Sequence, residues 1–313
     1  MITQNRRILI VLICLVGHLG CSQDTTQQSW KIVSSGIDEH LYSVHFVDAK
    51  HGWTVGSEGL VLVTTDGGRT WEVQSPQKAL SRNPLSKVHF STRTNGWIVS
   101  REGKIHYTGS GGKSWLPQTS MVKHGLLDLY FATPTEGWIV GGSGTILHTE
   151  NGGGRWEQQK TPIVKHLWAV HFVDNKNGWV VGEGGAILHT QDGGVQWKEQ
   201  QSNISTPLLG VYFADVQKGW VVGTDGMILH TADGGQTWNH QKTPSQKTLR
   251  SIAFINAQRG WAVGEGGLIL HTTDGGQSWT VQPSEAKYNL MDISLHKNRG
   301  WIVGANGTIL RRD

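Results

Sequence analysis

Carboxylates in glycine-rich turns are the first residues of this sequence that could do chemistry. The pattern Ser/Thr-x-Asp-x-Gly-x-Thr-Trp, which we call the Asp box, is complete at 64–71 and 231–238. Its third position is occupied, in six full or altered copies, by Asp66, Ser110, Asn151, Asp192, Asp233 and Asp274. An aspartate beside two glycines could bind a metal or serve acid–base catalysis. One copy per repeat favours a structural role instead, in which the side-chain oxygen accepts backbone N–H groups across a turn whose positive φ needs glycine.

Columns of histidine are the second chemical pattern. One repeat position holds His148, His189, His230 and His271, with Tyr107 and Arg311 in line. Another holds His45, His89 and His171, with Tyr130 and Tyr212. Zinc ligands lie about 2 Å from a common ion, whereas equivalent residues of neighbouring packed sheets are about 10 Å apart. We therefore predict structural histidines that form hydrogen bonds between repeats, no metal site and no cofactor.

Both patterns belong to a repeat of about 41 residues. Its copies are marked by Gly-Trp pairs, and the steps from Trp to Trp are 44, 41, 41, 41, 41 and 40 residues. The pairs stand at 52–53, 96–97, 137–138, 178–179, 219–220, 260–261 and 300–301. A period near 40 residues with short strands and tight turns is typical of β-propellers, with one four-stranded blade per copy. Seven copies predict an all-β, seven-bladed propeller over residues 29–313.

Within one copy, strands are expected at Leu208–Phe213, Trp220–Gly223, Met227–Thr231 and from Trp238 onward. Each run is short, apolar or β-branched, and bounded by glycine, aspartate or asparagine. The seventh copy reaches Asp313 without a fourth strand, while the segment Ser-Trp-Lys-Ile-Val at 29–33 resembles a fourth strand. We expect this N-terminal strand to complete the last blade, because the pairing closes the ring and removes two open sheet edges.

The first 21 residues have the features of an export signal. Arg6 and Arg7 precede an apolar run at 8–16, which is too short to span a membrane as a stable helix. The Gly-Cys pair that ends at Cys21 resembles a bacterial lipoprotein cleavage site, although His18 stands where that motif usually has leucine. We predict cleavage before Cys21, a polar tether at 22–28, and lipid anchoring on the periplasmic side of an outer membrane or the lumenal side of a thylakoid. A plain secretory signal is the alternative. Cys14 lies in the signal, so no disulfide is expected in the mature body.

Charge argues against nucleic acid and leaves one candidate interaction surface. The chain has 28 basic and 24 acidic residues, a balance too even for a nucleic-acid partner. The links from the fourth strand of one blade to the first strand of the next are basic, and should share a face with short turns that carry acids. The predicted partner-binding residues on this face are Lys78, Arg82, Lys123, Lys160, Lys165, Lys247 and Arg250. An ordinary solvated rim is the alternative to a binding face.

The repeat Gly-Trp-x-Val-Gly-x-x-Gly-x-Ile-Leu-His-Thr-x-Asp-Gly-Gly-x-x-Trp, its seven copies and the lipoprotein-like start resemble the photosystem II assembly/stability factor family. The resemblance covers 30–313 and implies a seven-bladed Asp-box propeller on the lumenal or periplasmic side. It also implies a non-catalytic assembly factor that binds newly made reaction-centre protein through a basic, arginine-containing face. The long loops here hold mainly lysine, and related repeats occur in bacteria without photosynthesis. We expect a monomeric scaffold for a membrane-protein segment or assembly intermediate.

An enzyme or a carbohydrate-binding module is the rival interpretation. Bacterial neuraminidases share Asp boxes, but they have six blades, an arginine triad and a Tyr–Glu nucleophile pair. The loop arginines here are Arg82, Arg101 and Arg250, and the sequence shows no evident Tyr–Glu pairing. Other retaining glycosidases need two carboxylates about 5 Å apart, whereas the candidate glutamates recur in equivalent turns of different blades. We predict no catalytic residues.

Overall fold

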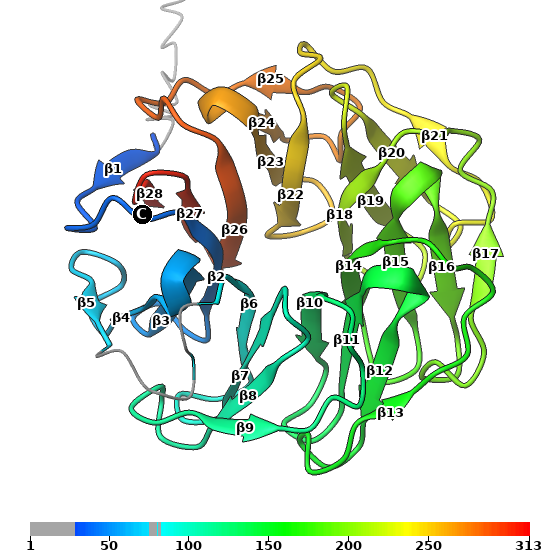
Figure 1. Ribbon diagram of the computed structural model, residues 1–313. Helices are drawn as coiled ribbons and strands as arrows, with labels where there is room; N and C mark the ends of the chain where they lie inside the picture. The colour runs from blue at the N-terminus through cyan, green and yellow to red at the C-terminus, as the bar shows by residue number, and fades with distance from the viewer. Residues whose placement is uncertain (1–28, 75–79, 81–82) are drawn as a thin grey trace, which may run out of the picture.

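Seven antiparallel sheets stand like blades around a central axis (Figure 1). The computed structural model describes residues 29–74, 80 and 83–313. Each sheet has four strands, and six of the sheets follow chain order, as in β2-β3-β4-β5. This confirms the predicted all-β, seven-bladed propeller. Cys21, the signal and the tether lie outside the described residues.

The strands form four concentric sets, and we number the blades 1 to 7 by their innermost strands. The innermost strands are β2 (Leu41–Phe46), β6 (Leu85–Phe90), β10 (Leu126–Phe131), β14 (Leu167–Phe172), β18 (Leu208–Phe213), β22 (Leu249–Phe254) and β26 (Leu290–His296). The second strands are β3 (Gly52–Gly56), β7 (Gly96–Ser100), β11 (Gly137–Gly141), β15 (Gly178–Gly182), β19 (Gly219–Gly223), β23 (Gly260–Gly264) and β27 (Arg299–Gly304). The third strands are β4 (Val61–Thr64), β8 (Ile105–Thr108), β12 (Ile146–Thr149), β16 (Ile187–Thr190), β20 (Ile228–Thr231), β24 (Ile269–Thr272) and β28 (Ile309–Arg312).

The outermost strands are β5 (Glu72–Val73), β9 (Leu116–Gln118), β13 (Glu157–Gln158), β17 (Lys198–Gln200), β21 (Asn239–His240), β25 (Thr280–Val281) and β1 (Lys31–Val33). Four short 3-10 turns join second to third strands, namely η1 (Ser57–Gly59), η2 (Gly142–Gly144), η3 (Glu183–Gly185) and η4 (Glu265–Gly267).

The N-terminal strand closes the ring, as the sequence predicts. Blade 7 has the strand order β1-β28-β27-β26, and β1 pairs antiparallel with β28, with Ile32 opposite Leu310. Trp30 is 3% exposed and meets Trp261 of blade 6 edge-on, with ring centroids 6.3 Å apart. Figure 1 shows β1 lying beside β28 although these strands come from opposite ends of the chain. Closure leaves the third strand of blade 7 paired on both sides.

Tryptophan stacking joins successive blades. Trp179 lies flat on Phe213 of the next blade, with ring centroids 3.5 Å apart and planes at 9°. Its indole N–H donates to the carbonyl oxygen of Gly234 in that blade's Asp box at 3.3 Å. Gly219 faces the other side of Phe213, where an added Cβ would overlap the ring. The same stack recurs as Trp53–Phe90, Trp97–Phe131, Trp138–Phe172, Trp220–Phe254 and Trp301–Phe46. The repeated Gly-Trp pair is therefore an interblade contact.

The Asp-box side chains face their own turns. Thr237 donates both its N–H (2.9 Å, to Oδ1) and its hydroxyl (2.6 Å, to Oδ2) to Asp233. Thr231 donates its hydroxyl to Asp233 Oδ1 at 2.7 Å and accepts the N–H of Gly235 at 2.8 Å. These hydrogen bonds, led by that of the Thr237 hydroxyl, lower the pKa of Asp233 to about 2. In this geometry the carboxylate oxygens are engaged by the turn itself.

Replacing Asp233 by alanine should destabilise the protein by about 1–3 kcal/mol, because the donors of the turn lose their acceptor. Asp192→Ala is the matched control. Asp192 accepts the N–H of Gln196 but has no hydroxyl partner at that position, so its loss should be smaller. Urea denaturation followed by tryptophan fluorescence measures both variants. Equal midpoints for Asp233→Ala and the unmodified protein would contradict the structural role of the box.

Candidate functional site

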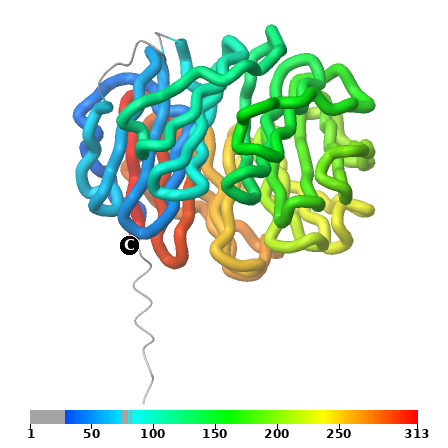
Figure 2. Tube along the Cα trace, turned by 90° about the horizontal axis from the view of Figure 1, so that it is seen from below, coloured from blue at the N-terminus to red at the C-terminus, as the bar shows by residue number. Residues whose placement is uncertain are grey.

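Loops of the propeller gather at two opposite faces, which Figure 2 shows edge-on. The links between blades share one face with the turns between second and third strands, as when Gly144 N donates to Lys165 O at 2.7 Å. We call this the link face. The Asp boxes and the turns between first and second strands share the opposite face, as when Gly234 N donates to Gln217 O at 2.8 Å. We call this the box face.

The predicted basic residues divide into three groups. Lys78 and Arg82 lie outside the described residues. Lys123, Lys160 and Lys247 are exposed on links of the link face, and Lys165 is half-buried there. Arg250 lies within strand β22 and lines the central channel. The link lysines and Arg250 therefore share one end of the molecule, but the described lysines are separate charges on three different links.

Two acidic side chains on the link face accept backbone N–H groups. Glu183 accepts the N–H of His166 at 3.4 Å, and Glu265 accepts the N–H of Thr248 at 3.3 Å. Lys165 lies over the same turn as Glu183, since a Cβ added to Gly184 would sit 3.3 Å from its Nζ. At this turn and at the equivalent one of Glu265, where Lys247 Nζ lies 2.9 Å from a Cβ added to Gly266, basic and acidic side chains are neighbours.

The central channel holds a buried ion cluster that sequence reasoning missed. Lys87 Nζ lies 3.1 Å from Asp292 Oδ2 and 3.4 Å from Asp128 Oδ1, so it links blades 2, 3 and 7. Burial alone would lower the pKa of Lys87, but the two carboxylates outweigh burial and raise it. Burial raises the pKa of Asp128, against the opposing effect of Lys87. The sequence signal was three charges in one column of the innermost strands.

The two channel carboxylates satisfy the inner edges of the blades. Asp128 accepts the N–H of Leu129 at 2.9 Å and that of Val170, in the next blade, at 2.8 Å. Asp292 accepts N–H groups from Ile293 (3.0 Å) and from Val44 of blade 1 (3.1 Å). An innermost strand has no neighbour on its channel side, so these bonds replace a missing fifth strand. Such carboxylates are poorly placed for acid–base chemistry on a substrate.

Imidazole and phenol rings of five successive blades form an arc in the channel. The contacts run His45–His89 (4.3 Å between centroids), His89–Tyr130 (5.5 Å), Tyr130–His171 (5.1 Å) and His171–Tyr212 (5.0 Å). Burial, with a smaller effect of Lys87, lowers the pKa of His45 and of His171 to about 4. His171 Nδ1 accepts the N–H of Phe213 in the next blade at 3.4 Å, as predicted for hydrogen-bonding histidines between repeats.

The third-strand histidines behave differently from the prediction. His189 stacks on Trp179 of its own blade, with centroids 4.5 Å apart and planes at 7°. Its Nε2 is buried and has no hydrogen-bond partner in the described part of the chain. These rings therefore pack within blades, because strands two and three place them directly opposite tryptophan. Within the described residues, no group of three or more His, Cys, Asp or Glu side chains is placed to hold a metal ion.

The link-face end of the channel is the best candidate for a binding site. The second residue of each innermost strand lines the channel, and the seven are Tyr42, Ser86, Leu127, Trp168, Leu209, Arg250 and Met291. Arg101, exposed on the turn after β7, lies with its guanidinium 5.1 Å from the centre of the Tyr42 ring. We call Tyr42, Arg101, Trp168 and Arg250 the channel mouth. Neither arginine forms an ion pair with another described residue.

A sequence signal for the channel mouth exists, although sequence reasoning missed it. The innermost strands begin with leucine in every blade, and six of the seven have phenylalanine at the sixth position. The second position varies from serine to tryptophan to arginine. In a repeat held constant by packing, a variable column facing a cavity of about 410 Å³ points to recognition. Guanidinium groups beside aromatic rings suit planar acceptors such as carboxylates and peptide carbonyls.

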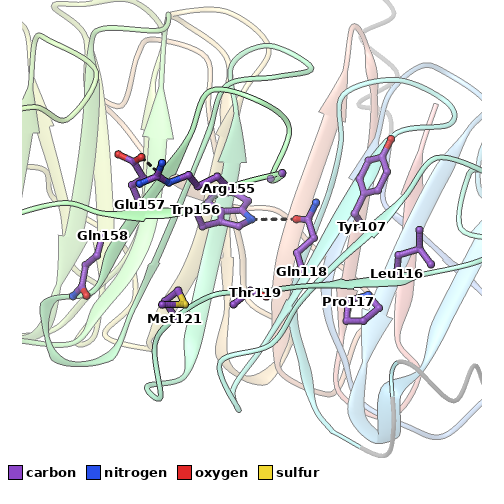
Figure 3. A pocket seen from close by; sticks show the side chains of 12 residues that line it. Tyr107, Leu116, Pro117, Gln118, Thr119, Met121, Arg155, Trp156, Glu157 and Gln158 are labelled. Carbon is purple, nitrogen blue, oxygen red and sulfur yellow. Dashed lines mark hydrogen bonds and ion pairs between the residues drawn. The ribbon is translucent and has the colours of Figure 1, made fainter.

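A larger groove of about 860 Å³ lies between the outer edges of blades 2 and 3 (Figure 3). Its indole and its charged side chains are already paired: Trp156 Nε1 donates to Gln118 Oε1 at 3.1 Å, and Arg155 pairs with Glu157 at 3.0 Å. Met121 is exposed at its edge. The groove is an interblade seam with no arrangement of nucleophile, acid and base.

These features define a seven-bladed Asp-box propeller with a closed ring, a charged channel and one arginine-bearing mouth. The chain belongs to the family described as Photosynthesis system II assembly factor YCF48, which matches residues 22–120, 118–201, 154–242, 195–286 and 237–313. This confirms the resemblance seen in the sequence.

Related sequences match over short stretches. The chain is 33% identical over 70 residues to "Photosystem II assembly lipoprotein Ycf48" of Prochlorococcus marinus, a match covering 21% of each protein. It is 49% identical over 45 residues to "Photosystem II stability/assembly factor HCF136, chloroplastic" of Guillardia theta, covering 14% of this chain and 11% of the relative. The matches thus span about a fifth of these relatives or less.

Solved structures share the ring as a whole. YCF48 from Cyanidioschyzon merolae superposes with a TM-score of 0.77 at 24% identity, covering 91% of this chain and 98% of the other. YCF48 bound to D1 peptide gives 0.78 at 22%, covering 90% and 94%. Virginiamycin B lyase from Staphylococcus aureus gives 0.77 at 13%, covering 90% and 99%. These likenesses show the fold, and the lyase shows that such a ring also occurs in an enzyme.

Proposed function

We propose that this protein is an exported, non-catalytic scaffold that holds a segment of a membrane protein at its link face during assembly of a complex. The observation that carries the proposal is the channel mouth, where Arg101 lies over the Tyr42 ring and Arg250 lines the same channel as Tyr42 and Trp168, with neither arginine in an ion pair within the described residues. The link lysines surround this mouth and can steer an acidic or extended segment toward it. A relative of known structure holds a D1 peptide, which supports a peptide as the ligand class.

The carboxylates of the boxes and of the channel support a non-catalytic role, because both sets are engaged in the fold. Those of the boxes are held by turn hydrogen bonds, and those of the channel hold strand edges and Lys87. The alternative, a glycan-binding or sialidase-like propeller, would need carboxylates that face a substrate. Incubation with fluorogenic sialosides and arylglycosides should therefore yield no hydrolysis above that of buffer. Turnover abolished by Asp128→Asn would overturn the scaffold proposal.

Export and lipidation of Cys21 are part of the proposal. Their support is the Gly-Cys pair after a charged and apolar start, together with relatives described as lipoproteins. In the described part of the chain, no helix is long and apolar enough to cross a membrane. We propose that the lipid holds the propeller beside the membrane, where a newly inserted protein segment can reach the link face.

Charge reversal tests the binding face. The triple variant Lys165→Glu, Lys247→Glu and Arg250→Gln should bind a synthetic D1 peptide, or membrane proteins from the source cell, at least about tenfold more slowly. Binding to the unmodified protein should weaken as salt rises, because screening acts beyond about 10 Å at 0.1 M salt. Surface plasmon resonance measures the association rate. Arg250 is replaced by glutamine and not by glutamate, because a glutamate there would place an unpaired carboxylate in the channel.

The matched control reverses three exposed charges of the box face, Arg69→Glu, Lys113→Glu and Lys176→Glu. Both triple variants should melt within a few degrees of the unmodified protein. Equal loss of binding in the two variants, or binding that is indifferent to salt, would exclude the link face as the site.

A further inference from the structure

One repeat position of the outermost strands is apolar and exposed on three consecutive blades. Two positions after the tryptophan that precedes each outermost strand, blades 6, 7 and 1 carry Val281, Ile32 and Val73. These side chains are 52%, 48% and 53% exposed. Each pairs with a leucine of the third strand, as do the equivalent residues of blades 3, 4 and 5. Those residues are Gln158, Glu199 and His240, and blade 2 has Pro117.

The polar blades show what this position requires. Glutamine, glutamate and histidine satisfy the same strand register, so the packing of the blade does not demand an apolar residue. Three consecutive blades therefore expose apolar surface to water at Val281, Ile32 and Val73, and this exposure does not stabilise the fold.

The apolar side of the rim coincides with the entry of the chain. Strand β1 is the outermost strand of blade 7, between the other two apolar blades, and its first neighbour in the chain is Trp30. Cys21 precedes Trp30 by nine positions. Nine residues span at most about 30 Å even when fully extended. A lipid on Cys21 would thus keep the rim of blade 7 within about 30 Å of the membrane.

An aromatic residue extends the same side. Tyr288, 49% exposed, lines a groove of about 410 Å³ together with Ile32. Tyrosine is favoured at membrane–water interfaces, because its ring is apolar and its hydroxyl forms hydrogen bonds with water. The exposed charges nearby are Lys31 and Lys287 against Asp38, Glu72 and Glu285. This surface therefore has no excess of basic charge that would attract anionic lipid.

We propose that Ile32, Val73, Val281 and Tyr288 rest in the headgroup region of a lipid bilayer, so that the propeller stands edge-on beside the membrane. The occupant of this surface is lipid, and the proposal rests on the anchoring of Cys21 in the proposed function. In this orientation the link face opens sideways, along the membrane surface. Four half-exposed side chains bind lipid weakly alone, so they act as the second of two signals, after the anchor.

Site-specific fluorescence tests the orientation. The mature chain with Cys21→Ser and a hexahistidine tag at its N-terminus is held on phosphatidylcholine vesicles that contain a nickel-chelating lipid. A polarity-sensitive dye is attached at Val73→Cys or Val281→Cys, and at Glu199→Cys or His240→Cys as matched controls. Nitroxide-labelled lipid should quench the first pair and leave the second pair unchanged. Equal quenching at all four positions, or none at 73 and 281, would overturn the proposal.

Release from the same vesicles tests the energetics. The triple variant Ile32→Ser, Val73→Ser and Val281→Ser should dissociate about tenfold faster than the unmodified rim when imidazole competes for the nickel lipid. The control triple Gln158→Ser, Glu199→Ser and His240→Ser should dissociate at the unmodified rate. Equal rates for both triples would count against the rim contact.

Fractionation of cells separates this inference from the anchoring on which it rests. The Cys21→Ser variant should move from membranes to the soluble envelope fraction, and a palmitate analogue should label the unmodified protein but not the variant. If labelling fails while the vesicle results hold, the lipid anchor is wrong and the rim stands as a membrane-facing surface. If labelling succeeds and the vesicles show no rim contact, the lipid anchor stands and the rim does not face the membrane.

Discussion

A variant that lacks residues 29–34 is expected to melt far below the intact protein. The deletion removes strand β1 from the edge of blade 7 and Trp30 from the interface with blade 6. A buried tryptophan contributes about 3–5 kcal/mol when truncated, and exposure of the β28 edge adds to that loss. Calorimetry of the purified mature chain measures the change. An unchanged melting temperature would show that ring closure through β1 does not stabilise the fold.

Two controls separate closure from the mere length of the chain. Deletion of 22–28 alone should leave the melting temperature unchanged, since those residues precede the propeller. Transfer of 29–34 to a position after Arg312, joined by a turn copied from 232–237, should restore most of the loss. In that permuted chain the fourth strand follows the third as it does in blade 5, where β21 follows β20. If the melting temperature of the permuted chain stays low, the position of the strand at the N-terminus, and not only its pairing with β28, stabilises the fold.

The repeat made the architecture predictable because packing repeats with it. Six of the seven Gly-Trp pairs place a ring on the phenylalanine of the next blade, and an added Cβ on the glycine of that blade would overlap the phenylalanine. At the seventh interface Trp261 meets Trp30 instead, so the Gly-Trp pair marks an interblade contact in every copy and seven copies reveal the ring. The sequence pattern also showed that copy seven lacks a fourth strand and that an extra strand is present at Trp30. Ring closure therefore followed from counting strands.

The binding region was less predictable because it depends on which columns face the channel. The sequence pointed to charged links, whereas Arg250 lies in a strand and comes to line one channel with Tyr42 and Trp168 only because seven strands converge. A bulge after the first residue of each innermost strand, as at Leu249/Ser251, alters the alternation that would otherwise assign faces. The third-strand histidines illustrate the same difficulty. Their column was evident, but their partner proved to be the tryptophan opposite in the same blade.

The ion cluster in the channel links three blades that are far apart in the sequence. Lys87 stands between Asp128 and Asp292, whose side chains are 10% and 7% exposed. Such a cluster is costly to break, because removal of one partner leaves buried charge without compensation. The lysine keeps 27% of its side chain exposed, which places the cost toward the lower end of the usual range.

The variant Lys87→Met should therefore lose about 3 kcal/mol of stability at pH 7.5. The loss should shrink as the pH falls. Burial already holds the pKa of Asp128 above its ordinary value, and Lys87 is the first of the effects that oppose this rise. Without the lysine, the folded state binds a proton at still higher pH than the unfolded state does. A group with a raised carboxyl pKa gains stability as pH drops through its folded value, so the variant recovers.

The stability of the intact protein also depends on pH, so the variant is compared with it at each pH. His45 and His171, with pKa values lowered to about 4, favour folding above their unfolded value near 6.5 and lose that contribution as pH falls toward 4. This loss occurs in both proteins, and the weaker repulsion without Lys87 reduces it in the variant. The difference in urea midpoint between the two should thus be largest near pH 7.5 and smallest near pH 5.

Adding Asp128→Asn to Lys87→Met should restore part of the stability at pH 7.5. A difference that is constant with pH, or that grows at low pH, would show that the cluster does not stabilise the channel by charge pairing.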